Sequence, residues 1–265
     1  MAGPDLLPLL ALATSLAEGA ADLLREAVDR TQLVETKTSL TDMVTATDRA
    51  AEALIVGGIR DARPDDGILG EEGTADPGTN GIRWVVDPLD GTTNFLYGVP
   101  AFSVSIAIEV DGVTEVGVVV DAMRRETFTA VRGRGARLND RPIGCRATED
   151  LASALVGTGF SYDAARRARQ GQVVAAVLPR VRDIRRFGGA AIDLCWVGAG
   201  RLDAHYERGL APWDLAAGSL VAAEAGATVG DLDGGPSSGA FTLAAAPPLF
   251  APLRDLLRSA GAATA

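Results

Sequence analysis

Acidic side chains at three separate places in the chain could hold divalent cations beside a phosphate group. Asp87 and Asp90 stand three residues apart in "DPLDGTTNF", while Glu71 follows "ILG" and Asp214 lies in "APWDLAAG". Carboxylates that project from the end of a strand suit Mg²⁺, which prefers oxygen ligands in octahedral geometry. Each acid also has a structural explanation when taken alone. Strand ends are often solvated, and the helix dipole favours an acid such as Asp214 in the first turn of a helix.

The stretch "DPLDGTTNF" offers more than its two acids. The Leu89 carbonyl and the Thr92 hydroxyl are further oxygen donors. Gly91 has no Cβ, so a phosphate can approach the backbone amides closely at this point. The competing interpretation is a simple turn that contains Asp90 and Gly91, with Asp87 as a cap, because Asp, Pro and Gly are ordinary turn residues. Without the other acids, the turn is the more economical interpretation.

Hydrophobic periodicity predicts helices and strands that interleave along the chain. Helical spacing of Leu and Ala over residues 6–28 and a capping pattern at 45–47 predict two N-terminal helices, the second ending before Pro64. Two alternating apolar runs around Asp111 and Gly112 predict a β-hairpin, so part of the sheet should be antiparallel. In the second half, helical patterns surround predicted strands at "RLDAHYE" and "FTLAAA". The predicted fold class is therefore α/β, with mixed layers.

Composition and charge limit the function classes. A chain of 265 residues, 47% of them hydrophobic, can bury a large core, so we expect one domain over 1–265 with two close-packed halves, 1–145 and 146–265. A net charge of −10 argues against binding nucleic acid through a basic surface. The N-terminal segment has no basic leader, and Gly, Pro, Ser and Thr interrupt the uncharged stretches, which argues against a membrane span. Two isolated cysteines favour a reduced, cytoplasmic protein.

Taken together, these motifs closely resemble those of the inositol monophosphatase family of magnesium-dependent, lithium-sensitive sugar phosphatases, in its bacterial form. The matching segments, in chain order, are "KTSLTDMVTATD" (37–48), "ILGEEG" (68–73), "WVVDPLDGTTNF" (84–95), "GRGARLND" (133–140), "RRFGGAAIDLCWVGAGRLDAHYE" (185–207) and "PWDLAAGSLVAAEAGA" (212–227). The resemblance covers nearly all of the chain and outweighs the turn interpretation. It implies a layered αβαβα sandwich, as in inositol monophosphatase and fructose-1,6-bisphosphatase, with mixed and largely antiparallel sheets. It also implies a homodimer.

The same resemblance implies a set of metal ligands. They are Glu71, Asp87, Leu89 through its carbonyl, Asp90, Thr92 and Asp214. Asp87, Asp90 and Asp214 would hold the Mg²⁺ ion at the leaving oxygen. The other Mg²⁺ ion, which binds the attacking water, would be held by Glu71, Asp87, the Leu89 carbonyl and Thr92. Asp87 would therefore bind both ions. A third, weaker Mg²⁺ would also contact Glu71. The expected catalytic residues are Glu71, Thr92 and Asp48, because Asp48 would orient Thr92 to help deprotonate the water.

The residues expected to bind substrate lie largely in the same motifs. They are Lys37, Glu71, Leu89, Asp90, Gly91, Thr92, Thr93, Arg186, Gly188, Gly189, Ala190, Glu207 and Asp214. Glu207 resembles the family's acid that contacts inositol hydroxyls, but it could instead pair with Arg201 or Arg208 at the surface. Lys37 could attract the anionic substrate or remain a solvated lysine. Gly189 stands where many relatives carry Ser or Thr, which leaves the exact substrate less well defined.

The expected reaction is hydrolysis of myo-inositol 1-phosphate by water, without a phosphoenzyme, assisted by two or three Mg²⁺ ions. The alternatives within the superfamily are fructose 1,6-bisphosphate, histidinol phosphate and 3′-phosphoadenosine 5′-phosphate. A different class of function is a regulatory role on the same fold, through binding of a protein partner. This chemistry requires no histidine base. His205, the single histidine of the chain, is expected to be an ordinary strand residue that nothing else pairs with.

Overall fold

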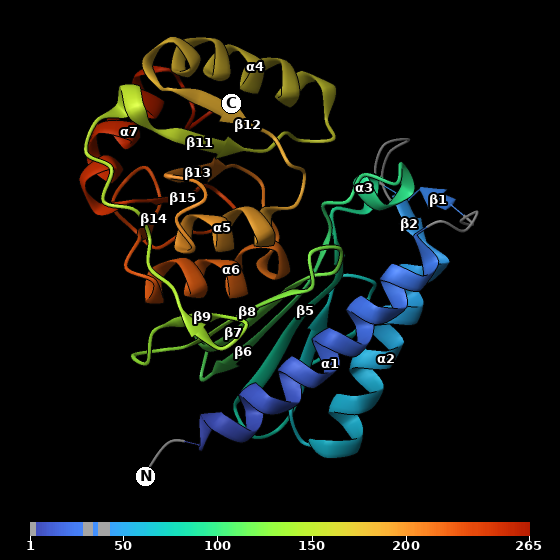
Figure 1. Ribbon diagram of the computed structural model, residues 1–265. Coiled ribbons are helices and arrows are strands. Elements are labelled where there is room, and N and C mark those ends of the chain that lie inside the picture. The colour runs from blue at the N-terminus through green and yellow to red at the C-terminus, as the bar shows by residue number, and fades with distance from the viewer. Residues whose placement is uncertain (1–3, 29–33, 37–42) are drawn as a thin grey trace.

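Helices and sheets alternate in five layers in the computed structural model, which describes residues 4–28, 34–36 and 43–265 (Figure 1). The helices are α1 (Leu6–Ala27), α2 (Ala46–Ala62), α3 (Thr92–Leu96), α4 (Ala164–Val177), α5 (Ala190–Gly198), α6 (Pro212–Glu224) and α7 (Pro247–Ser259), with the 3-10 turns η1 (Leu151–Ser153) and η2 (Leu178–Arg180). The pair α1 and α2 covers one outer face, α4 and α7 cover the other, and α5 and α6 lie between the two sheets. This arrangement confirms the expected αβαβα sandwich.

The larger sheet is built mainly from consecutive antiparallel strands. In spatial order these are β10 (Arg141–Pro142), β9 (Ala136–Leu138), β8 (Glu126–Val131), β7 (Val113–Asp121), β6 (Ser103–Val110), β5 (Ile82–Asp90), β3 (Gly67–Gly70) and β4 (Ala75–Asp76). The neighbours β3 and β5 pair in parallel, so both end at the same edge of the sheet. The predicted hairpin is confirmed, because β6 and β7 are joined at Asp111 and Gly112, both of which have positive φ.

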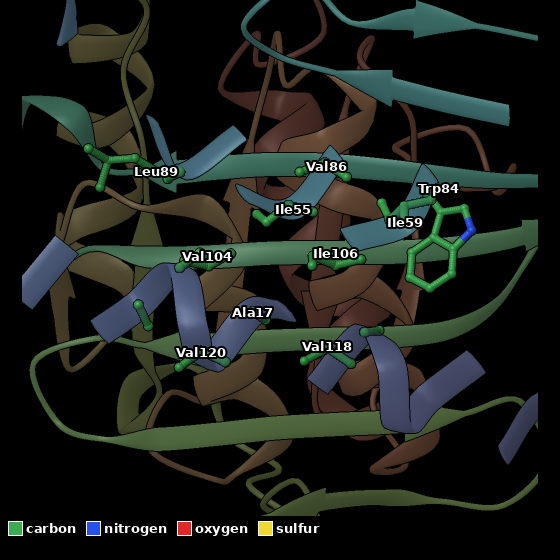
Figure 2. Packing of buried hydrophobic residues seen from close by; sticks show 14 of the residues in the cluster. Ala17, Ile55, Ile59, Trp84, Val86, Leu89, Val104, Ile106, Val118 and Val120 are labelled. Atoms are coloured by element: carbon green, nitrogen blue, oxygen red, sulfur yellow. The ribbon is translucent and has the colours of Figure 1, made fainter. Parts of the chain in front are cut away.

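One face of the larger sheet packs against α1 and α2. Buried residues of α1 recur at helical spacing, so that one stripe of the helix faces the sheet; they include Leu9, Ala13, Ala17, Ala20 and Leu24. Figure 2 shows side chains from both helices meeting those of β5, β6 and β7 in this layer. The alanines let the helix approach the strands closely. The resulting core holds in place the strand ends that carry the acidic motifs.

Helix α1 is also long and apolar enough, by length and composition, to cross a membrane, and it is the one helix in the described ranges that meets this criterion. Core helices of globular proteins have the same composition, so the criterion is weak evidence by itself. In this fold α1 contacts α2 and the strands β6, β7 and β8. Its apolar stripe is therefore used for packing within the protein.

The smaller sheet combines parallel and antiparallel pairs. Its order is β12 (Asp183–Arg185), β11 (Leu155–Thr158), β13 (Ala204–Glu207), β15 (Thr242–Ala245) and β14 (Thr228–Gly230), and a separate pair is formed by β1 (Val34–Thr36) and β2 (Met43–Thr45). The sequence analysis predicts β13 and β15 but misses β11, β12 and β14. Each missed strand has only three or four residues, and β11 joins β13 in parallel across a long separation in sequence.

The central helices consist mainly of apolar and small residues because a sheet covers each face of their layer. Every residue of α5 is buried, and α6 packs closely against it at Gly218, where a Cβ would lie 2.8 Å from the Ala191 carbonyl oxygen. This contact fixes the first turn of α6, which carries Asp214, beside the ends of the larger sheet. The expected division of the chain into two close-packed halves near residue 145 stays a prediction.

Candidate active site

The predicted acids come from three elements and line one cleft. Glu71 follows the last residue of β3, Asp87 and Asp90 lie at the end of β5, and Asp214 is in the first turn of α6. These four residues and Leu89 line a cleft of about 460 Å³. Because β3 and β5 are parallel neighbours, their acids meet at one edge of the sheet, and α6 brings the fourth acid from the next layer. The structure therefore brings together residues that are widely separated in the sequence.

Hydrogen bonds fix the two acids of β5 in different ways. The Asp87 carboxylate accepts a hydrogen bond of 2.9 Å from the Leu89 amide, which closes a tight local turn. The Asp90 carboxylate accepts from the amides of Ala190 and Ala191 at 3.2 and 2.9 Å. These amides form the N-terminus of α5, where the helix dipole favours a negative charge. Asp90 thus links the larger sheet to the central helical layer.

Burial and mutual repulsion favour the protonated forms of these acids. Burial raises the pKa of Asp87 well above its ordinary value, and the charges of Glu71, Asp90 and Asp214 raise it further. Burial also raises the pKa of Asp90 to about 7; the α5 amides oppose this shift, and the charges of Glu207 and Glu71 add to it. The pKa of Asp214 is raised well above its ordinary value, again by burial first and then by the Asp90 charge. A divalent cation would relieve this repulsion.

The donor set fits a hard divalent cation in its chemistry. Four carboxyl groups and the Leu89 carbonyl supply oxygen atoms, and Glu71 and Asp87 are close enough to hydrogen-bond to each other. Among the described residues, however, no three Asp, Glu, His or Cys side chains already stand in an arrangement that could hold an ion. A bound cation would reduce the repulsion between these carboxylates and so favour a closer arrangement of them.

The segment after β5 turns directly into the short helix α3. Gly91 caps this helix with φ of 93°, and a Cβ there would lie 3.0 Å from a backbone carbonyl oxygen, so glycine is required. Thr92 lines the cleft, and its hydroxyl donates a hydrogen bond of 3.2 Å to the Leu89 carbonyl oxygen. Asp48 is buried in the first turn of α2, and its expected role toward Thr92 stays a prediction. Lys37 lies outside the described residues.

The loop before α5 forms a second wall of the cleft. Its lining residues are Arg186, Gly188, Gly189 and Ala190. A Cβ on Gly189 would lie 2.9 Å from Oδ2 of Asp90, so the missing side chain leaves this carboxylate uncrowded. Thr93 does not line the main cleft; it lines an adjoining hollow to which Arg186 also contributes.

Glu207 stands at the end of β13 and lines the same cleft. The two arginines that the sequence offers as alternative partners are bonded elsewhere. Arg201 forms a bidentate ion pair with Glu126, and Arg208 donates a hydrogen bond to the Ala265 carbonyl oxygen. In these contacts neither arginine is paired with Glu207.

The sequence analysis misses Asp193, which is buried in the first turn of α5 and lines the cleft. Oδ2 of Asp193 lies 3.5 Å from Nδ1 of His205, and Nε2 of His205 lies 3.4 Å from Oε2 of Glu207. The expectation that His205 has nothing to pair with is therefore wrong. A signal was present, because Asp193 is the one charged residue in the apolar run "AAIDLCWVG", and a buried charge requires a partner.

A five-layer sandwich with an acidic cleft between the larger sheet and the central helices defines a layered α/β protein with a candidate site for divalent cations. The chain belongs to the inositol monophosphatase family, whose model matches residues 5–262. This assignment confirms the resemblance carried by the two acidic motifs and by the segments that follow them.

Individual relatives agree with this assignment. The chain is 48% identical over 206 residues to the inositol-1-monophosphatase SuhB of Mycobacterium tuberculosis, covering 74% of this chain and 71% of that protein. It is 44% identical over 245 residues to the Nus factor SuhB of Pasteurella multocida, covering 91% and 92%. Among solved structures, the extragenic suppressor protein suhB from Bartonella henselae matches with a TM-score of 0.91 at 36% identity, covering 95% of this chain and 98% of that chain.

Proposed function

We propose that the protein is a Mg²⁺-dependent phosphatase for sugar or polyol phosphate monoesters, with myo-inositol 1-phosphate as the first candidate substrate. One observation carries the proposal: Glu71, Asp87, Asp90 and Asp214 line a single cleft although they come from three elements. Such a cleft would repel a phosphate monoester unless bound cations reversed the local field. The proposal is also supported by relatives that are named inositol-1-monophosphatases at 48% identity.

The bound ions would supply a water activated for attack and would neutralise charge on the phosphate. The residues that would hold them are Glu71, Asp87, Leu89 through its carbonyl, Asp90, Thr92 and Asp214. The Thr92 hydroxyl, which donates to the Leu89 carbonyl oxygen, would help to deprotonate the attacking water, with Asp48 orienting it. The amides of Gly91, Thr92 and Thr93 at the start of α3 would bind phosphate oxygens.

Glu207 would select polyols. Its carboxylate lines the cleft that contains the acids and can accept hydrogen bonds from neighbouring hydroxyl groups of a substrate. A site built to bond hydroxyls rejects a substrate that lacks them, because its own polar group is left unpaired. Gly188, Gly189 and Ala190 line the same cleft, so their loop would lie beside the ring. Fructose 1,6-bisphosphate, histidinol phosphate and 3′-phosphoadenosine 5′-phosphate remain the alternatives that a substrate panel must include.

Phosphate release from that panel, measured with purified protein and Mg²⁺, tests the proposal. We expect the highest kcat/KM for myo-inositol 1-phosphate. Asp90→Asn should lower kcat by on the order of 100-fold or more, because an oxygen ligand loses its charge. Asp61→Asn, at an exposed acid of α2, is the matched control and should leave turnover unchanged. An unsubstituted protein that releases no phosphate from any member of the panel with Mg²⁺ would refute the proposal.

A second candidate function is regulatory binding of a protein partner on the same fold, because the Pasteurella multocida relative is named a Nus factor. The Asp90→Asn variant separates the two functions. A cellular phenotype that survives this substitution unchanged would favour the regulatory role, and one that is lost with phosphatase activity would favour catalysis. We also propose, from the family resemblance alone, a cytoplasmic homodimer. A monomeric mass in light scattering would contradict the dimer.

A further inference from the structure

His205 lies at the centre of a buried line of three titratable side chains. It is completely buried on β13, with Asp193 of α5 on one side and Glu207 on the other. Its ring nitrogens lie 3.5 and 3.4 Å from the two carboxylates, and neither nitrogen has a closer hydrogen-bond partner within the described part of the chain. Each nitrogen therefore faces one acid. Such a line connects the central helical layer to the carboxylate that lines the cleft.

The neighbouring strand β11 leaves a slot for this line. In the parallel pairing of β11 with β13, Gly157 stands opposite His205, and a Cβ on Gly157 would lie 2.9 Å from Nδ1 of the imidazole. Gly159 lies two residues further on, and a Cβ there would overlap the carboxylate of Glu207. Two glycines at alternate positions thus clear the same face of the sheet for both side chains. The register of β11 against β13 therefore fixes the positions of both glycines relative to His205 and Glu207.

Electrostatics favours an imidazolium between the two acids. Burial alone would lower the pKa of His205, but the contact with Glu207 and the charge of Asp193 more than offset burial, so the pKa is raised. Burial raises the pKa of Asp193, whereas the positive charge of His205 opposes that shift, so the imidazolium and the Asp193 carboxylate favour each other's charged forms. Glu207 also lies close enough to Asp90 and Asp214 to raise their pKa values, so its own charge is repelled by the metal-site acids. A positive charge behind Glu207 counteracts that repulsion.

We propose that His205 is a positioning residue for substrate selection: anchored on Asp193, it holds the Glu207 carboxylate in the cleft, oriented toward substrate hydroxyls. This inference rests on the proposed function and deepens it. Glu207 contacts the polyol, whereas His205 acts only through Glu207. Substitution at 205 should therefore affect recognition of hydroxyl groups more than it affects the phosphate chemistry.

The test compares two substrates that share a phosphate ester but differ in hydroxyl groups. KM and kcat are measured for myo-inositol 1-phosphate and for p-nitrophenyl phosphate, which has no hydroxyl to bind. His205→Phe should raise KM for the inositol ester about tenfold, the effect expected when a polar contact to substrate is lost, with a much smaller change for the phenyl ester. His205→Gln should recover part of the loss, because its side-chain amide can still donate to Glu207.

Matched variants keep the result interpretable. Tyr206→Phe changes the adjacent buried residue, whose ring packs on the opposite side of the sheet, and should leave the ratio of the two KM values unchanged. Glu207→Gln combined with His205→Phe should be no worse than Glu207→Gln alone, since both act through one carboxylate. If thermal unfolding shows that the His205→Phe protein is not folded, His205→Gln replaces it in the comparison. A smaller rise in the KM for the inositol ester is then expected.

Three results would overturn the inference. These are equal losses on both substrates, independent effects in the double variant, and an inositol KM that no substitution at 205 changes. If the wild-type protein hydrolyses both esters but the variants give any of these results, only the role of His205 is refuted and the proposed function stands. Absence of hydrolysis in the wild-type protein would instead remove the proposed function and this inference together.

Discussion

Two opposing effects set the pKa of the Asp90 carboxylate. Burial and the neighbouring acids favour its neutral form, while the amides of Ala190 and Ala191 at the start of α5 favour its charged form. The balance leaves its pKa at about 7, far above the ordinary 3.8 of an aspartate. A group in this state gives up its proton readily when a cation arrives. Proton and metal binding at this residue should therefore compete.

The raised pKa values predict how stability depends on pH in the absence of metal. Between about pH 4 and pH 7, the folded protein keeps protons on Asp87, Asp90 and Asp214 that the unfolded chain has lost. Because the folded state binds more protons, these groups make the free energy of unfolding fall as pH rises through this window. Asp90→Asn removes one of them. It should therefore stabilise the metal-free protein at pH 7.5 by about 1 kcal/mol or more, and by less at pH 4.5.

Chemical denaturation of both proteins at the two pH values, in the presence of a chelator, measures this difference. Saturating Mg²⁺ should reverse the order at pH 7.5, because the wild-type site gains an ion that the variant holds poorly. A variant that is less stable than the wild type at pH 7.5 without metal would contradict the assigned repulsion between the acids.

At the scale of elements, the site depends on how closely α6 approaches the larger sheet. Gly117 of β7 lies under this helix, and a Cβ there would stand 2.8 Å from the Ala217 carbonyl oxygen. The backbone of α6 thus rests almost directly on the strand. Because α6 carries Asp214 in its first turn, any displacement of the helix also moves one of the acids away from the cleft.

Gly117→Ala should therefore destabilise the protein and lower its activity together. Overpacking at such a contact costs about 1–3 kcal/mol, and movement of Asp214 should raise the Mg²⁺ concentration that activity requires. Gly171→Ala is the matched control. Gly171 lies in α4 with open space around its Cα, so alanine there should stabilise by roughly 0.5–1 kcal/mol through helix propensity. Equal effects of the two alanines on unfolding would contradict the close approach of α6.

The sequence predicts the acids more readily than the sheet that joins them. Asp87 and Asp90 follow a strongly apolar strand, and the hairpin at Asp111 carries its own turn signal, so local patterns suffice for both. The strands β11, β12 and β14 are too short to show alternation, and both partners of β11, the strands β12 and β13, follow only after α4. The contact of Asp193 with His205 could not be predicted for the same reason. It requires the helix α5 to lie across β13, which no local pattern encodes.

On the scale of the whole molecule, the layered fold keeps four acids together despite their repulsion. The larger sheet carries Glu71, Asp87 and Asp90, and the central helical layer carries Asp214. Figure 1 shows these layers packed together, and a buried core lies on each face of the larger sheet, one of which is seen in Figure 2. Packing of the two layers provides the free energy that confines these charges. The smaller sheet adds Glu207 from the other side of the central layer. Acids for metal binding and an acid for substrate selection thus face one cleft from different layers.

The most direct test of this account is the location of bound cations in crystals of the protein soaked with Mn²⁺, a substitute for Mg²⁺ that anomalous scattering can identify. We predict anomalous peaks within bonding distance of Asp87, Asp90 and Asp214, and of Glu71, with the carboxylates drawn inward. Loss of the peak beside Asp214 in the Asp214→Asn protein would confirm that the central layer completes the site. Mn²⁺ bound elsewhere, with the cleft carboxylates free of metal, would contradict the central claim.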